Sequence, residues 1–396
     1  MSRGQPRTQY ERTYVLLPPG AGEEWPIAAL HATWGSHRYT VGGSADDAGI
    51  GDLDVRRVIA VNPHLWPGPV EWFFNEYYPG AQVTIIRAET PQALIEALAD
   101  QQQPPPPRPG VYTLRGVHDR AGADWLKAEG LAGWCLIPVY LNTTPQNLQL
   151  GGYAEAGIRV LVNLRYSYAV DDGGQGTMPG PNQITAFENA CIGTMRTNPA
   201  AWGFVYCNEM NNSREWPKEK DYPLSPGYYL DSYNRVWSAK PDRARLLPGA
   251  IDPYNPGWGD WRKGWGEVLK SLAGCDGLAW HAYTHGPDPA LIWHHKRFGD
   301  DPLTGVFYDL RVLESQQAII LDKFKDKPQI VTECNHFVRH DGKIGWEANS
   351  GPWVTEAYQY FASRGVAGAC LFRFNHNDWK FGNLPDVLCA LRNITP

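Results

Sequence analysis

The sequence predicts an α/β protein in which a (β/α)8 TIM barrel follows a small α/β N-terminal module. Three observations predict this fold class. Eight short apolar segments recur along residues 110–396, a longer amphipathic segment follows each of them, and a proline-rich stretch separates this region from the first hundred residues. Near-continuous apolar strands that alternate with helices are typical of a parallel sheet covered by helices. Eight such units favour a TIM barrel, typically about 250 residues long, over a doubly wound open sheet.

The predicted strands are short runs rich in β-branched and aromatic residues, and the predicted helices are longer segments with helical apolar periodicity. The strands are expected at residues 110–118, 134–141, 158–166, 201–209, 245–251, 276–283, 328–334 and 367–375. The helices that follow them are expected around residues 123–130, 144–157, 181–199, 226–240, 261–274, 307–324, 353–365 and 384–393.

Domain boundaries follow from the stretch QQQPPPPRPG. Consecutive prolines form a semi-rigid extended spacer and cannot continue a helix. We therefore expect a small α/β module at 1–100, a proline-rich linker at 101–109 and the barrel at 110–396. Within the module, strands are predicted at 37–43, 55–63 and 81–88, and helices at 69–78 and 90–100. The run VIAVNPHLW followed by YYPGAQVTII faintly resembles the end of a LysM glycan-binding module.

Composition narrows the range of partners. The formal net charge is −6, whereas nucleic-acid binding needs a basic surface for phosphate contacts. No apolar run reaches the length of roughly 18–20 residues that crosses a bilayer. The N-terminal residues lack the apolar core of a signal peptide. The seven cysteines form no CxxC pair and lie mostly in apolar runs, which favours a reducing compartment. We expect neither nucleic acid nor membrane as a partner, and a cytoplasmic protein or one released by lysis, or an extracellular one if a signal was removed.

Polar residues at the ends of the predicted strands identify the candidate site, because a TIM barrel carries its active site at the C-terminal ends of its strands. Glu209 ends the fourth predicted strand, and Glu333 lies at the end of the seventh. Other polar side chains end the first, third and sixth strands, namely His118, Arg165, His281 and Tyr283. Each glutamate alone is also compatible with a strand cap or an arginine pair. Two carboxyl groups across one barrel mouth instead favour retaining glycoside hydrolysis, which uses a nucleophile and an acid/base roughly 5–5.5 Å apart.

Three motifs in order resemble clan A of the glycoside hydrolases, a superfamily of retaining (β/α)8 enzymes. They are Asn208-Glu209 at the fourth strand, His281-Ala282-Tyr283 at the sixth and Glu333 at the seventh. The resemblance covers the whole predicted barrel. It implies that Glu209 is the acid/base and Glu333 the nucleophile, and that the tyrosine hydroxyl bonds to the nucleophile.

Supporting roles can be stated as expectations. Asn208 would donate to the sugar 2-hydroxyl, and Tyr283 would keep the nucleophile ionised and oriented. His281 would bond to the acid/base or to the sugar. Arg165 is interpreted either as a partner of the nucleophile or as part of barrel packing, and His118 as a structural or a site residue.

The eighth predicted strand departs from the clan A pattern, which places a tryptophan under the sugar at the end of that strand. Here the strand ends LFRFNHNDW, so Trp379 comes several residues late. Phe374 and Trp280 are the other candidates for this platform.

The sequence therefore predicts a retaining glycoside hydrolase that cleaves β-glycosidic bonds of an oligo- or polysaccharide. Two alternatives stay open: a carbohydrate-binding barrel without turnover, and a peptidoglycan hydrolase of a phage or lytic system, which the LysM likeness motivates. We expect no cofactor, since GxSxG, HExxH, Walker and GxGxxG motifs are missing. We also expect no metal, because the adjacent His294 and His295 have no acidic or cysteine partner at ligand spacing. The sequence gives no oligomeric state.

Overall fold

A computed structural model describes most of the chain, and all structural statements below concern those residues. They are residues 12–33, 39–43, 55–77, 82–101, 114–167, 176–217, 222–376 and 379–394. The chain divides into two compact units, Met1–Gln103 and Pro104–Pro396, and each is described by itself. The predicted linker at 101–109 lies outside the described residues from residue 102 onward.

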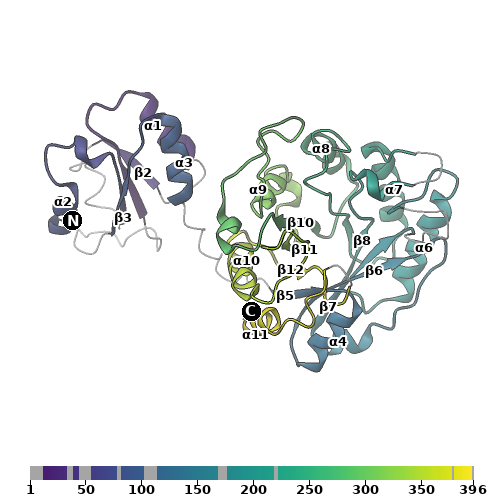
Figure 1. The fold of residues 1–396 in the computed structure, drawn as a ribbon. Helices are drawn as coiled ribbons and strands as arrows, with labels where there is room; N and C mark the ends of the chain where they lie inside the picture. The colour runs from purple at the N-terminus through teal and green to yellow at the C-terminus, as the bar shows by residue number, and fades with distance from the viewer. Residues whose placement is uncertain are drawn as a thin grey trace, which may run out of the picture. The chain divides into compact units, whose positions relative to one another are not determined.

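The N-terminal unit is a four-stranded parallel sheet with helices on both faces (Figure 1). The spatial order of its strands is β2-β1-β3-β4. Ala29 of α1 and Leu94 of α3 pack on one face, and Phe74 of α2 packs on the other. The small α/β module is thus confirmed, and the two runs that resemble LysM contribute to β3 and β4 of its sheet. The bounds are β1 (Arg12–Leu16), α1 (Glu24–Thr33), β2 (Tyr39–Gly42), β3 (Val55–Val61), α2 (Val70–Tyr77), β4 (Gln82–Ile86) and α3 (Pro91–Gln101).

Two elements of this unit, β1 and α1, were not predicted from the sequence. Pro26 interrupts the apolar pattern of α1. The helix tolerates this proline because the N–H groups of a helix's first turn have no partner within the helix.

The C-terminal unit contains eight parallel strands in the spatial order β10-β11-β12-β5-β6-β7-β8-β9. The two end strands approach each other where the Asp276 amide donates to the Leu246 carbonyl at 3.0 Å, so the sheet is nearly closed. Each strand coincides with a predicted one, which confirms the (β/α)8 fold class. The bounds are β5 (Leu114–His118), β6 (Gly133–Tyr140), β7 (Ile158–Arg165), β8 (Gly203–Tyr206), β9 (Leu246–Pro248), β10 (Leu278–Thr284), β11 (Gln329–His336) and β12 (Gly368–Leu371).

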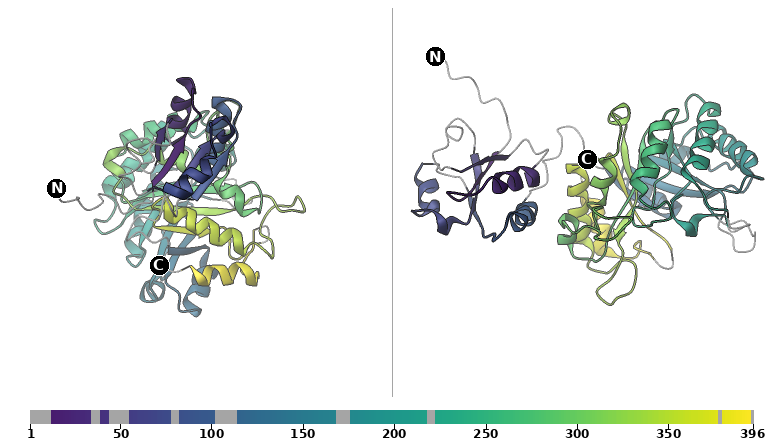
Figure 2. Two further views of the ribbon diagram at one scale, coloured as in Figure 1. Left: turned by 90° about the vertical axis from the view of Figure 1, so that its left-hand side faces the viewer. Right: turned by 90° about the horizontal axis from the view of Figure 1, so that it is seen from above.

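Helices surround the barrel strands (Figure 2). Helices α5 and α9 have only five and six residues and are shorter than predicted. Gly151 and Gly152 open α5, and glycine is a poor helix former. The bounds are α4 (Arg120–Ala128), α5 (Gly151–Glu155), α6 (Ile184–Thr197), α7 (Pro226–Ala239), α8 (Trp261–Ser271), α9 (Val312–Gln317), α10 (Gly351–Ser363) and α11 (Pro385–Asn393).

The barrel interior is a packed core, and alternation along the strands separates it from the layer under the helices. On β6, Trp134 and Leu136 belong to the interior cluster, whereas Cys135 and Ile137 pack in the cluster that includes the helices. This is the period-2 pattern of a strand. Because side chains fill the inside of the barrel, a ligand site opens above this core, at the C-terminal ends of the strands.

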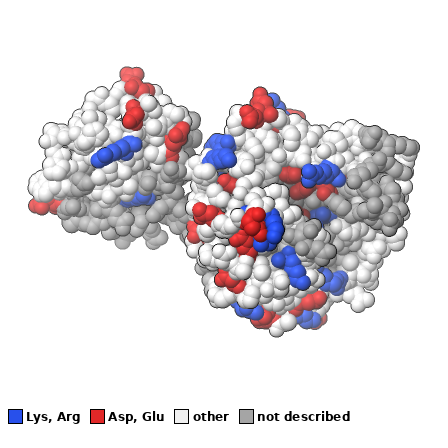
Figure 3. Space-filling model, viewed as in Figure 1, with Lys and Arg blue, Asp and Glu red and all other residues white. Residues whose placement is uncertain are grey.

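The described surface mixes charges of both signs. Figure 3 shows lysine and arginine side chains close to aspartate and glutamate side chains over the face in view. In the described part of the chain, no helix combines the length and apolarity needed to cross a membrane. All seven cysteines are unpaired, and only Cys389 is exposed.

Candidate active site

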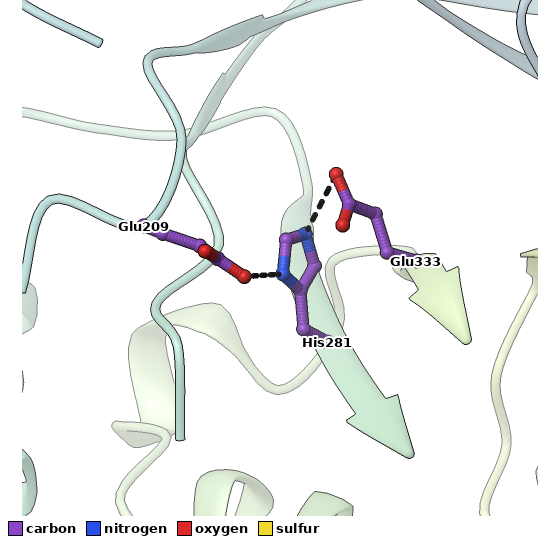
Figure 4. A group of neighbouring side chains, drawn as sticks. All are labelled: Glu209, His281 and Glu333. Carbon is purple, nitrogen blue, oxygen red and sulfur yellow. Dashed lines mark hydrogen bonds and ion pairs between the residues drawn. The ribbon is translucent and has the colours of Figure 1, made fainter. Parts of the chain in front are cut away.

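Two glutamate side chains from different strands converge on one histidine at the barrel mouth. Glu209 follows β8, Glu333 belongs to β11, and His281 of β10 lies between them (Figure 4). One carboxyl oxygen of each glutamate and one ring nitrogen of His281 all lie within 4.8 Å of one another. This spacing is comparable with the roughly 5–5.5 Å between the carboxyl groups of retaining glycosidases.

A β-bulge in β11 turns Glu333 toward the barrel interior. Ile330 contacts the interior core, so strict alternation would point Thr332 inward and Glu333 outward. The register with β10 shifts at this point: Glu333 lies opposite His281, and Thr332 is the extra residue. Bulges often re-aim a side chain next to an active site. This one gives Glu333 the same face as His281.

The segment after β8 carries unusual backbone conformations. Cys207 and Glu209 have φ angles of 66° and 47°, in the left-handed region that residues other than glycine seldom adopt. The Glu209 amide donates to the Ala250 carbonyl at 2.7 Å, which ties this turn to the end of β9. A Cβ on Gly249 would lie 2.5 Å from the Tyr206 carbonyl oxygen, so only glycine permits this approach. Such strain is concentrated at functional sites.

Glu333 is held by positively charged and hydrogen-bonding groups. Its side chain is 5% exposed, and one carboxyl oxygen accepts from Arg165 Nη2 at 3.0 Å. The other accepts from the Tyr283 hydroxyl at 2.8 Å. His118 and His281 place ring nitrogens 3.7 and 3.8 Å from the first oxygen. Burial acts to raise the pKa of Glu333, but the charges of His281 and Arg165 and a hydrogen bond with His118 outweigh burial and hold its pKa well below the ordinary value.

Glu209 has different surroundings. One of its oxygens lies 2.8 Å from His281 Nδ1, and the other accepts from Asn212 Nδ2 at 3.3 Å. Its side chain is 14% exposed. Burial acts to lower the pKa of His281, but the charge of Glu333 and the contact with Glu209 raise that pKa above its ordinary value. The imidazole therefore favours its protonated form between the two carboxyl groups.

The same three side chains, Glu209, His281 and Glu333, form the one group in the described residues with a spacing that could ligate a metal ion. The Arg165 guanidinium lies 3.0 Å from Glu333 and would repel a cation there. The donor set therefore fits acid–base and nucleophilic chemistry better than metal binding.

A cavity of about 380 Å³ opens above the two carboxyl groups. Its walls combine charged and amide groups with several aromatic rings. The lining residues are Glu209, Asn212, Arg214, Asp252, Tyr254, Asn255, Tyr283, His285, Glu333, Phe337, Phe372 and Trp379. Carboxyl groups beside aromatic faces are suited to a ligand that has hydroxyl groups and an apolar C–H face.

Of the aromatic residues proposed from the sequence for the sugar platform, Trp379 lines this cavity. Its ring packs against Phe337 and Phe372, with centroid distances of 5.5 and 5.8 Å. Phe374 instead packs against Phe381 and is not among the lining residues.

Trp280 lies on the other side of the sheet from the cavity. It is fully buried in the cluster beneath the helices and donates to Gln329 Oε1 at 3.2 Å. Its neighbour His281 points inward, and adjacent residues of a strand point to opposite faces. The sequence-based suggestion that Trp280 contacts the sugar does not match this position.

The remaining predicted residues surround the carboxyl groups without lining the cavity. Asn208 precedes Glu209 and is 4% exposed. Arg165 reaches Glu333, and its Nε donates to Asn163. His118 is buried beside Glu333. Burial lowers the pKa of His118 and favours its neutral form.

Sequence reasoning missed the polar wall made by Asn212, Asp252, Tyr254 and Asn255. A signal for part of it was present, because Asp252 directly follows the fifth predicted strand at 245–251. The others lie in loops, where no periodicity marks the direction of a side chain.

Comparison with known proteins gives structural similarity only. No protein-family model matches the sequence, and no curated protein matches it. A family 39 glycoside hydrolase from Bacteroides cellulosilyticus WH2 is 14% identical, with a TM-score of 0.42 over 67% of this chain and 58% of that chain. This chain thus spans less than two thirds of that enzyme. A glucosidase from Croceicoccus marinus is 13% identical, with a TM-score of 0.49 over 72% and 68% of the two chains. A family 44 xyloglucanase from Paenibacillus polymyxa is 13% identical, with a TM-score of 0.45 over 73% and 76%. At these identities the likeness concerns the fold.

Proposed function

We propose that the protein is a retaining glycoside hydrolase that cleaves β-glycosidic bonds of an oligo- or polysaccharide by double displacement. The observation that carries the proposal is the contrast between two nearby carboxyl groups. Glu333 is buried and ion-paired, and Glu209 lies within reach of it but contacts only neutral donors and the shared His281. A nucleophile must be ionised, and an acid/base must gain and lose a proton.

In the first step, the Glu333 carboxylate attacks the anomeric carbon while Glu209 protonates the departing glycosidic oxygen. The C–O bond to the leaving group breaks as the C–O bond to Glu333 forms, which inverts the anomeric centre. The Tyr283 hydroxyl and Arg165 hold the carboxylate ionised and fix its direction.

In the second step, Glu209 removes a proton from water, which attacks the glycosyl-enzyme and releases Glu333. The second inversion restores the original configuration of the sugar. The partial exposure of Glu209 gives this carboxyl group access to water. His281 Nδ1 lies 2.8 Å from Glu209, so a protonated imidazole would stabilise the carboxylate that forms when Glu209 gives its proton to the leaving group.

Substrate binding is proposed to use the aromatic wall and the amide before the acid/base. The face of Trp379, supported by Phe337 and Phe372, would stack on the apolar side of a sugar ring. Asn208, directly before Glu209, would donate to the 2-hydroxyl, a contact that strengthens in the transition state.

The test is hydrolysis of aryl β-glycosides and soluble polysaccharides by the wild type, Glu209→Ala and Glu333→Ala. The control is Glu267→Gln, which changes an exposed carboxyl group in a surface ion pair with Lys270. We expect wild-type turnover on at least one substrate and an unchanged rate for the control. Glu209→Ala should lose roughly 10²–10⁴-fold, and Glu333→Ala should lose more, since no other group replaces the nucleophile.

Three other results would change the proposal. Glycan binding without turnover in the wild type would identify a carbohydrate-binding barrel. Cleavage of purified peptidoglycan, with every other glycan left intact, would narrow the substrate to the bacterial cell wall. Equal rates for the wild type and both alanine variants would exclude the assigned pair.

A further inference from the structure

A second carboxyl group, Asp252, is linked to Glu209 through one amide. Asn212 Nδ2 lies 3.3 Å from Glu209 Oε2 and 3.1 Å from Asp252 Oδ2. An amide nitrogen carries two hydrogens, so it can donate one to each carboxyl group. Asp252 lies just beyond β9 and Glu209 just beyond β8, so this amide joins the ends of neighbouring barrel strands.

The orientation of the Asn212 amide is determined by its other contacts. Its Oδ1 accepts from the backbone N–H of Arg214 at 3.0 Å, and a backbone N–H can only donate. The same Oδ1 accepts from Asn255 Nδ2 at 3.0 Å, while Asn255 Oδ1 accepts from the Gly257 N–H at 3.0 Å. The nitrogen of Asn212 must therefore face the two carboxyl groups.

Asp252 uses both of its oxygens in this arrangement. Oδ1 accepts from the backbone N–H of Tyr254 at 2.9 Å, and Oδ2 accepts from Asn212. Its own backbone N–H donates to Asn211 Oδ1 at 2.8 Å, and Asn211 Nδ2 returns a bond to the Asp252 carbonyl at 2.7 Å. An asparagine at this position has only one side-chain acceptor and could not satisfy both donors.

The electrostatics agree with this link. Burial, and next the charge of Glu209, raise the pKa of Asp252 to about 7. His281 and Glu333 also act on this carboxyl group. The other polar and titratable groups on the cavity walls near Asp252 are Arg214, Tyr254, Tyr283 and His285.

We propose that Asp252 is a positioning residue for the acid/base: by accepting one hydrogen of Asn212, it directs the other hydrogen to Glu209 Oε2. His281 contacts the other oxygen of Glu209, so the two contacts together prevent the carboxyl group from rotating. This inference rests on the proposed glycosidase function. It assigns a role to the end of β9, the fifth barrel strand. The Asn-Glu, His-x-Tyr and Glu motifs assign no role to that strand.

Substrates with different leaving groups distinguish a positioning role from a merely structural one, because a structural defect would slow the hydrolysis of all of them alike. Departure of phenol from a phenyl β-glycoside needs proton transfer from Glu209, whereas 2,4-dinitrophenolate departs without it. For the sugar that the wild type accepts, Asp252→Asn should lower kcat/KM about 10–100-fold on the phenyl glycoside. On the dinitrophenyl glycoside, the loss should be less than about 3-fold. Asn212→Ala should give the same split, and the double variant should be no slower than Asn212→Ala alone.

Asp242→Asn is the matched control, because Asp242 is exposed on the turn after α7, and both of its rates should equal those of the wild type. Equal losses on the two glycosides, or no loss on the phenyl glycoside, would overturn the role of Asp252. Glu209→Ala separates this outcome from failure of the proposed function. If Glu209→Ala shows the leaving-group split and Asp252→Asn does not, only the inference fails. If Glu209→Ala shows no split, the acid/base assignment fails as well.

Discussion

The two sides of the cavity contain the same kind of residue in opposite surroundings. On the β11 side, Glu333 faces a guanidinium, a tyrosine hydroxyl and two imidazoles. On the side formed by β8 and β9, Glu209 shares an amide with a second carboxyl group, Asp252. The first arrangement stabilises a negative charge, and the second penalises having two at once. In the proposed mechanism the chemical role of each glutamate is set by its neighbours, and the variants below alter one side at a time.

The largest expected effect is on the products formed with azide. In Glu333→Ala, azide should attack the sugar once and give the α-glycosyl azide. In Glu209→Ala, azide should attack the glycosyl-enzyme after a first inversion and give the β-glycosyl azide. NMR of the isolated azides distinguishes the two anomers. The opposite assignment would mean that the two glutamates exchange roles.

Arg165→Met should cause the next largest loss, because it leaves the buried Glu333 without its ion-pair partner. Breaking such a pair costs about 3–5 kcal/mol, and if this cost falls on the reactive form, kcat/KM should fall roughly 10²–10⁴-fold. The pKa of Glu333 should also rise, which would move the acidic limb of the kcat/KM profile to higher pH. Arg392→Met, which removes an exposed pair with Glu129, is the control and should leave the profile in place. An acidic limb that stays in place in Arg165→Met would show that this pair does not set the charge of Glu333.

Tyr283→Phe should have a smaller effect, because it removes one hydrogen bond to Glu333 and leaves the ion pair. Bonds to charged groups contribute about 1.5–3 kcal/mol, which corresponds to a loss of roughly 10–100-fold in kcat/KM. Tyr153→Phe removes a comparable bond to Asp124, whose α4 lies outside the barrel, and serves as the matched variant. Equal kinetics for the two variants would argue against a role for Tyr283 at the nucleophile.

The smallest effect is expected on stability as a function of pH. The folded-state pKa of Asp252 is raised to about 7, so its stabilising contribution is present below about pH 4 and is lost as pH rises through about 7. Relative to Asp252→Asn, the wild type should thus lose a few °C in Tm between these values.

Glu333 has a lowered pKa, so its contribution is present above about pH 4.5 and is lost at more acidic pH. We therefore expect two opposite trends in Tm between pH 3 and pH 8. The Tm of the wild type should fall relative to that of Asp252→Asn as pH rises, and it should rise relative to that of Glu333→Gln. A difference between wild type and Asp252→Asn that does not change with pH would contradict the raised pKa.

The sequence predicts the barrel because each of its strands is a separate apolar run followed by helical periodicity. Strand ends also identify which polar residues gather at the mouth. Alternation is less reliable at the site itself. It places His281 inward, and the same rule excludes Trp280 from the cavity. Applied to β11, strict alternation would have pointed Glu333 outward. The extra residue, Thr332, arises from the pairing of β11 with β10, and the sequence alone does not reveal it.

The link between Glu209 and Asp252 could not be read from the sequence for a different reason. Its parts lie in separate loops, and Asn212 and Asp252 are 40 positions apart. Asparagine is frequent in turns, where it bonds to nearby backbone groups, so an asparagine in a loop does not indicate a distant side-chain partner. Only the approach of β9 to β8, which Gly249 permits, brings them together.

The most direct test of the central claim is the anomeric configuration of the first product, followed by ¹H NMR while the wild type hydrolyses an aryl β-glycoside or a β-linked oligosaccharide that it accepts. Double displacement by Glu333 and Glu209 predicts that the β-anomer forms first and then mutarotates. Initial appearance of the α-anomer would show a single displacement by water and would contradict the assignment of Glu333 as nucleophile.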